Sequence, residues 1–289
     1  MVRVGVSQNA IRRAAAREAV GKHLNVQFTD VTVPAAEGTF GSRNEGVQDS
    51  LSGVKEVGNG SPSLIFVYSD EMKPQAKGSK SAGEPTAQAK DSALAWEELF
   101  QREGDYTVFI PGRFFNIVKM NATGVPAAKN KYLGSEKAPV VILTHKDGKV
   151  EEVFEGKAKI KGVVVAKGMV DILQKDGYIT TIGQFAELSG LMVELEKIEL
   201  AVVIAKEDEG KRRGKVAETQ AKTAKRAAKS DKEVKPSKTA DAAEKALEAS
   251  DAALNEKLKG KQEILKKEFA LLQELNLPAD KMPKEPVGP

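Results

Sequence analysis

The sequence predicts an α/β domain followed by a C-terminal helical region. Short continuous apolar runs at Leu64–Tyr68 and Val140–Leu143 are typical of strands buried on both faces of a sheet. Helix-like segments separate and follow these runs. From Ile182 onwards, leucines recur at steps of three and four residues, a stripe that favours paired helices. We therefore expect a mixed sheet flanked by helices, and then a helical hairpin or coiled coil.

Changes in composition along the chain predict four regions. Residues 1–60 form an N-terminal extension, because a short helix and one strand are followed there by a stretch rich in glycine and serine. Residues 61–180 hold the α/β domain. Residues 181–278 form the helical hairpin or coiled-coil region, and residues 279–289 a disordered, proline-rich tail.

The N-terminal extension begins with an alanine-rich stretch. Ala10–Val20 favours a helix on propensity, and the alternating apolar residues of Val26–Val33 predict a strand that ends before Pro34. Glycine, serine and asparagine recur from Ala35 to Ser63, so this stretch is expected to be a long loop.

The first half of the α/β domain continues from the Leu64–Tyr68 strand. Asp70–Lys90, rich in lysine, glycine and serine, predicts a mobile loop, after which Asp91 or Ser92 caps a helix that runs to Arg102. The only tryptophan, Trp96, falls on the buried side of that helix.

In the second half of the α/β domain, the turns mark where the predicted strands and helices begin and end. Tyr106–Ile110 and Phe114–Met120 are expected to be strands separated by the Pro111-Gly112 turn, with a short helix over Pro126–Leu133. The segment Lys146–Lys149 predicts a type I′ hairpin turn, because Asp-Gly tolerates positive φ angles.

The domain then closes with two elements. Val150–Phe154 returns antiparallel to the preceding strand, and Gly162–Lys175 is a helix with one apolar face.

From Ser61 to Tyr178, this order and its turn chemistry resemble the thioredoxin superfamily. The resemblance implies a thioredoxin-like mixed sheet, and it matches Pro139 to the family's cis-proline, which makes Ala138–Pro139 a candidate cis bond. An ordinary trans bond is the alternative. Where the family places Cys-x-x-Cys after the first strand of this region, the chain has Ser69-Asp70-Glu71-Met72, so the resemblance implies a redox-inactive member.

Composition excludes several classes of chemistry. With no cysteine in the chain, there is no thiolate for disulfide exchange, and thiol–disulfide oxidoreductase activity is excluded. With two histidines, a histidine-rich metal site is excluded as well. We expect no catalytic residues, no metal and no cofactor. No apolar stretch approaches the length needed to span a bilayer.

The leucine stripes of the C-terminal region are candidate contact surfaces. An antiparallel hairpin within the chain and pairing with another chain, including a second copy of this one, satisfy them equally well. Around Gly210–Gly214 the first helix is expected to weaken. The stripe residues predicted to bind are Leu191, Leu195, Ile198, Leu258, Leu265 and Leu272.

Lys206–Lys238 has an excess of basic residues. A solvated helix surface is the favoured interpretation, and contact with a nucleic-acid backbone the alternative, although the segment lacks aromatic residues for base stacking.

These patterns favour a non-catalytic protein-binding module that acts as a scaffold, adaptor, chaperone-like factor or subunit of an assembly. Partners are expected at the C-terminal helices or at the cleft formed by Tyr68, Ser69, Ala138 and Pro139. The alternative is a non-thiol enzyme, such as a glutathione-binding transferase that uses the hydroxyl of Tyr68 or Ser69. A cytoplasmic location is expected; the arginines near the N-terminus, such as Arg12 and Arg13, would alternatively suit organelle import.

Overall fold

The fold consists of two compact units. The computed structural model describes residues 7–24, 26–32, 51, 54–55, 57–73, 83–101, 106–125, 133–179, 182–227 and 238–286. The sheet unit takes the described residues within Leu24–Ser189 and Leu271–Pro283, and the helical unit takes the others.

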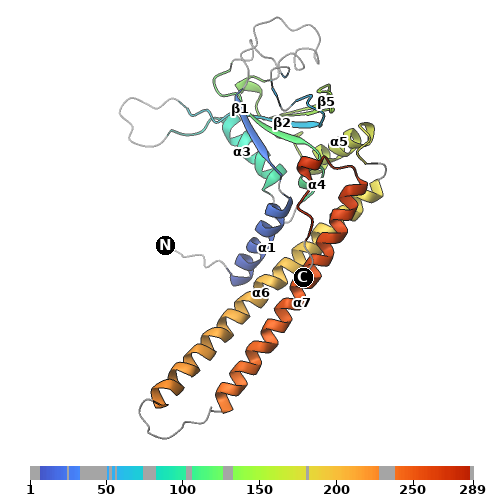
Figure 1. Ribbon diagram of the computed structural model, residues 1–289. Helices are drawn as coiled ribbons and strands as arrows, with labels where there is room; N and C mark the ends of the chain where they lie inside the picture. Colours follow the sequence, from blue (N-terminus) through green and yellow to red (C-terminus); the bar gives the residue numbers. More distant parts are fainter. Residues whose placement is uncertain are drawn as a thin grey trace, which may run out of the picture. The chain divides into compact units, whose positions relative to one another are not determined.

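A five-stranded mixed sheet organises the sheet unit (Figure 1). The strand order is β1-β3-β2-β4-β5; β1, β3 and β2 run parallel, whereas β4 is antiparallel to β2 and β5 is antiparallel to β4. Apolar runs form the central strands because both of their faces are covered. The strands are β1 Phe28–Thr32, β2 Ser63–Tyr68, β3 Asn116–Asn121, β4 Val140–Thr144 and β5 Val150–Glu155.

Helices α3 (Ala87–Phe100) and α5 (Gly162–Lys175) cover one face of the sheet. Trp96 of α3 packs on Phe66 of β2, with ring centroids 5.1 Å apart. On α5, Gly168 lies so close to β4 and β5 that an added Cβ would be 2.9 Å from Leu143 Cδ1 and 2.6 Å from Glu152 Oε2. The single turn α4 (Phe109–Gly112) and the 3₁₀ helix η2 (Ala279–Lys281) also belong to this unit.

The opposite face of the sheet carries an aliphatic cluster. Ile65 and Val67 of β2 and Val118 of β3 point into it, as the period of two along a strand requires. Leu51 and Leu133, both fully buried, cover the cluster. A 3₁₀ helix, η1 (Ser135–Lys137), follows Leu133 and leads to β4, and the Ala138–Pro139 bond before β4 is cis, as the resemblance implied.

The strand predicted at Tyr106–Ile110 is wrong. Phe109–Gly112 form the single turn α4, in which the Gly112 N–H donates to the Val108 carbonyl at 2.9 Å. Pro111 fits because proline is tolerated in the first turn of a helix, where its missing N–H is not needed. Most of the helix predicted at Pro126–Leu133 lies outside the described residues.

The start of α3 also differs from the prediction. The cap is Thr86, whose Oγ1 accepts a hydrogen bond from the Ala89 N–H at 3.3 Å, and neither Asp91 nor Ser92 caps the helix. The earlier start shortens the predicted loop over Asp70–Lys90. Its two ends are joined to each other, since the Lys73 N–H donates to the Glu84 carbonyl at 2.8 Å.

The β4–β5 hairpin is confirmed, although its turn is not type I′. Type I′ requires positive φ at both central residues, but only Gly148 has one, at 86°. The His145 N–H donates to the Lys149 carbonyl at 2.9 Å and closes the turn.

Within the described residues, the helical unit contains most of α1 (Gln8–Leu24), α6 from Gly190 onwards (Ile182–Ala227 in full) and α7 up to Ala270 (Lys238–Glu274 in full). Within this unit, Arg12 of α1 pairs with Glu207 of α6 at 2.6 Å and Arg17 pairs with Glu196 at 3.0 Å. Helix α6 continues through Gly210 and Gly214 without the predicted weakening, because a lone glycine costs only about 1 kcal/mol in a long helix.

Helices α6 and α7 form an antiparallel hairpin within one chain (Figure 1). Lys261 pairs with Glu199 near one end, and Arg212 Nη1 donates to the Ala246 carbonyl at 2.9 Å farther along. Residue numbers rise along α6 as they fall along the facing part of α7, so the two helices are antiparallel. None of the helices in the described ranges combines the length and apolar character that a bilayer crossing requires.

We expect Gly168→Ala to destabilise the sheet unit by about 1–3 kcal/mol, because the added methyl group would overlap Leu143 and Glu152. Urea unfolding followed by the fluorescence of Trp96, the only tryptophan, measures this unit selectively. Gly190→Ala in α6 is the matched control, since nothing lies within 4 Å of its added Cβ. An unchanged Gly168→Ala midpoint would show that α5 can move away from the sheet.

His145 links the β4–β5 hairpin to the end of α5. Its Nδ1 lies 2.7 Å from Asp176 Oδ1 and its Nε2 lies 3.0 Å from Glu151 Oε2. Burial lowers the pKa of His145, but the hydrogen bonds and charges of the two carboxylates outweigh burial, so the net pKa is raised.

A raised folded-state pKa makes the His145 contribution pH-dependent. The contribution is complete below the unfolded pKa of about 6.5 and is lost as the pH rises through the folded pKa. We expect the free energy of unfolding of wild type, minus that of His145→Asn, to fall by less than about 1 kcal/mol as the pH rises from about 6.5 through the raised folded-state pKa. Urea unfolding of both proteins from pH 5.5 to 9 measures this difference in free energy. A difference that rises with pH would contradict a raised pKa for His145 in the folded state.

Candidate functional site

The candidate site is an open pocket beside the C-terminal end of β2, which we call the Trp96 pocket. It has a volume of about 440 Å³ and lies between the sheet and the first part of α3. Its walls are largely apolar and aromatic, as is typical of ligand pockets. The lining residues are Phe66, Tyr68, Ser69, Asp70, Met72, Pro85, Ala89, Ser92, Ala93, Trp96, Gln101 and Lys119.

An aromatic cluster forms the rigid wall of the pocket. Trp96 contacts Phe66, Phe28 and Phe100, with ring centroids 5.1, 5.1 and 4.5 Å apart. Edge and tilted contacts of this kind add stability beyond the buried area. Met72, which lines the pocket at its rim, stays 51% exposed. Part of the apolar surface is therefore available to a ligand.

Lys119 places a positive charge inside this apolar setting. It lies on β3, opposite Phe66 in the parallel register. Its Nζ is 4.7 Å from the centre of the Trp96 ring and 4.9 Å from the centre of the Tyr68 ring, which is cation–π geometry. Within the described part of the chain, the partners of this amine are ring faces and no carboxylate is within ion-pair distance.

Polar groups at the end of β2 are held by their neighbours. Burial raises the pKa of the Tyr68 hydroxyl; the charges of Asp30 and Asp70 add to the rise and a hydrogen bond with Asn121 opposes it. The hydroxyl is therefore protonated at neutral pH. The carboxylate of Asp70 accepts a hydrogen bond from Thr123 Oγ1 at 2.5 Å, which orients it at the pocket rim.

Ser69 is buried, and its polar atoms are held in local hydrogen bonds. It is 2% exposed, its N–H donates to Ser92 Oγ at 3.2 Å, and its own Oγ accepts from the Glu71 N–H at 3.3 Å. A serine nucleophile requires a base within hydrogen-bond reach. Neither histidine lines the pocket, since His23 pairs with Glu268 and His145 with Asp176 and Glu151.

The structure brings the four predicted cleft residues to the same end of the sheet. Val67 pairs with Val140, so Tyr68 at the end of β2 and Ser69 after it lie beside Ala138 and Pro139 before β4. Only Tyr68 and Ser69 line the Trp96 pocket. Ala138 and Pro139 are buried. The open surface therefore lies on the Tyr68 side of this strand end.

The predicted stripe residues lie along α6 and α7. Leu191 and Leu195 are buried, and Ile198 is half-buried, with its Cδ1 3.2 Å from a Cβ added at Gly260 of α7. Leu258 and Leu265 are half-buried. Leu272 is fully buried and belongs to the sheet unit. The hairpin thus uses part of the stripe within the chain.

Several basic side chains in the described part of Lys206–Lys238 have acidic neighbours. Lys222 pairs with Glu218 and Arg213 pairs with Glu209, both one helical turn away. Such pairs are typical of a solvated helix surface.

Sequence reasoning missed Lys119 and Met72 as pocket residues. A lysine inside the otherwise apolar strand was the available signal for Lys119, whereas the position of Met72 depends on tertiary packing. Among the described residues, no group of three or more histidine, aspartate or glutamate side chains is arranged to hold a metal ion.

Comparison of the chain with protein-family models, curated proteins and solved structures gave no match.

The two serines at the pocket floor should differ in their contribution to stability. Ser92→Ala leaves the Ser69 N–H without its acceptor, and the free energy of unfolding should fall by about 1–3 kcal/mol. Ser69→Ala should cost less, about 1 kcal/mol or below, because solvent can hydrate the N–H of exposed Glu71. Urea unfolding measures both; equal losses would contradict this assignment.

Proposed function

We propose that the protein is a non-catalytic protein-binding module and that a segment of its partner docks in the Trp96 pocket. The sheet unit is, in this proposal, a redox-inactive thioredoxin-like domain. The strand order β1-β3-β2-β4-β5, the antiparallel β4 and β5, and Pro139 directly before β4 all support this. The pocket lies where redox-active members of the superfamily carry their dithiol.

The observation that carries the proposal is the pairing of an open aromatic wall with a lysine that has no carboxylate partner among the described residues. An apolar side chain can pack on Trp96 and Met72 and remove their exposed surface from water. An acidic group beside it can pair with Lys119, whose charge is already partly desolvated by the two rings. A short peptide with adjacent apolar and acidic residues fits both requirements.

The alternatives have weaker support. A hydroxyl that activates a bound thiol, as in a glutathione transferase, would have to be Tyr68 or Ser69, but the Tyr68 pKa is raised and the Ser69 oxygen is buried in a local hydrogen bond. Nucleic-acid binding would rest on basic side chains that already have acidic neighbours, such as Arg213 and Lys222.

Trp96 is a built-in reporter, because it is the only tryptophan and it lines the pocket. Peptides selected from a displayed random library against the full chain should be enriched in adjacent apolar and acidic residues. Their titration should change Trp96 emission. We expect Lys119→Met to weaken binding about fivefold to tenfold, which corresponds to about 1–1.4 kcal/mol.

Lys149→Met, at the exposed β4–β5 turn, is the matched control and should leave the affinity unchanged. A photoreactive amino acid at Met72 should capture the physiological partner in cells. The proposal is wrong if selected peptides bind without perturbing Trp96 and with equal affinity to wild type and Lys119→Met.

A further inference from the structure

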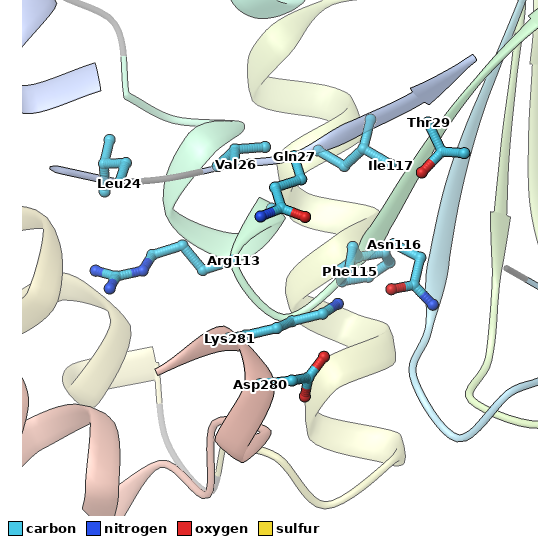
Figure 2. Close-up of a pocket in the computed structure, with 11 residues that line it drawn as sticks. Leu24, Val26, Gln27, Thr29, Arg113, Phe115, Asn116, Ile117, Asp280 and Lys281 are labelled. Carbon is cyan, nitrogen blue, oxygen red and sulfur yellow. The ribbon is translucent and has the colours of Figure 1, made fainter. Parts of the chain in front are cut away.

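A second, smaller cavity in the sheet unit is not used by the proposed function. It has a volume of about 120 Å³ and lies between the segment that leads into β1, the segment that leads into β3, and η2 (Figure 2). Gln27, Asn116, Asp280 and Lys281 contribute its polar groups near the centre, and Val26 and Ile117 contribute apolar surface. The part of the chain predicted as a disordered tail therefore supplies one side of this cavity.

The amine of Lys281 is the unusual group here. Its Nζ is buried and has no hydrogen-bond partner among the described residues. Figure 2 shows the amine end among the side chains of Gln27, Asn116 and Asp280, whereas the guanidinium of Arg113 points away from it. Asp280 acts on the amine through its charge only.

Burial has a direct chemical consequence for this amine. It lowers the pKa of Lys281 to about 8, although the charge of Asp280 opposes the shift. About half of the Lys281 amines are then uncharged at pH 8, compared with less than about 1% for an ordinary lysine, whose pKa is about 10.4. The uncharged amine is the nucleophilic form, and desolvation is a common way of activating a lysine for carbonyl chemistry.

We propose that Lys281 is a reactive lysine that condenses with a small aldehyde admitted to this cavity. The uncharged Nζ attacks the carbonyl carbon, the π electrons move to the carbonyl oxygen, and a proton transferred from nitrogen to oxygen gives a carbinolamine. Loss of that hydroxyl with the second N–H proton, as one water molecule, leaves an imine. No oxidant or reductant is involved.

The neighbouring groups and the size of the cavity define the ligand. The amide of Gln27, above the amine in Figure 2, can donate a hydrogen bond to the carbonyl oxygen. The Asp280 carboxylate can accept the proton that the nitrogen releases. A volume of 120 Å³ is smaller than the roughly 150 Å³ cavity that admits benzene, so an aldehyde of about two to four carbons fits and an aromatic aldehyde does not.

The test is competitive labelling of the full chain. The protein is treated briefly with propionaldehyde and cyanoborohydride, which traps the imine as a stable propyl amine, and peptide mass spectrometry measures the occupancy of every lysine. We expect Lys281 to be labelled at least about tenfold faster than exposed Lys149 at pH 7.5, with a pH midpoint near 8. Benzaldehyde, which exceeds the cavity, should show no preference for Lys281.

Asp280→Asn tests the electrostatic part of the proposal, since removal of the carboxylate should shift the labelling midpoint at Lys281 to lower pH. Lys281→Arg should abolish labelling at this position and leave the other lysines unchanged. Labelling of Lys281 no faster than Lys149 from pH 6.5 to 9 would overturn the proposal. Equal preference for propionaldehyde and benzaldehyde would overturn the role of the cavity.

Discussion

The packing of Trp96 between Phe66 and Phe28 is the contact on which the candidate site depends. It attaches α3 to β2 and to the edge strand β1 at once, so one side chain fixes both the helix and the wall of the pocket. The same indole supplies one of the two ring faces against Lys119. Because aromatic side chains bury a large area in a fixed orientation, this wall is a rigid surface with the Lys119 ammonium placed over it.

The end of β2 illustrates how local hydrogen bonds hold a pocket wall in place. Ser69 and Ser92 hold the backbone there through hydrogen bonds that satisfy a buried N–H. Asp70, Asn121 and Thr123 form a second local network at the rim. Ser69, Ser92 and Asp70 line the pocket but are engaged in these hydrogen bonds, whereas the amine of Lys119 contacts ring faces.

Elements with strong local signals could be predicted from the sequence. Continuous apolar runs gave β2 and β4, the Asp-Gly turn gave the β4–β5 hairpin, and the amphipathic period gave α5. The strand predicted at Tyr106–Ile110 is wrong because a short apolar run fits a strand and a buried helical turn equally well. The hydrogen bond from the Gly112 N–H to the Val108 carbonyl selects the turn. The cap at Thr86 was missed because two later polar residues suit the same role.

The candidate site was only partly predictable because several of its residues meet through the topology of the sheet and not through a local sequence pattern. Tyr68 and Ser69 follow directly from the end of a recognisable strand, whereas Lys119 reaches the pocket through the register of β3 against β2. Lys281 is farther still from any local signal, since its cavity joins segments about 165 to 255 residues away in sequence, around Asn116 and Gln27. Residues brought together by topology alone have no periodic pattern that could reveal them.

The two lysines show how one side-chain type acquires opposite chemistry within one unit. At Lys119 the ring faces stabilise the ammonium, so the group suits recognition of an anionic partner. At Lys281 no ring face or hydrogen-bond acceptor among the described residues compensates for burial, and the charge of Asp280 offsets it only in part, so the charged form is destabilised and the amine becomes a nucleophile. The difference arises from what surrounds each nitrogen, because the covalent structure of the two side chains is the same. A lysine whose charge is stabilised by its neighbours, such as Lys119, therefore suits binding of an anion. A lysine whose buried amine is not stabilised in its charged form, such as Lys281, suits nucleophilic reaction.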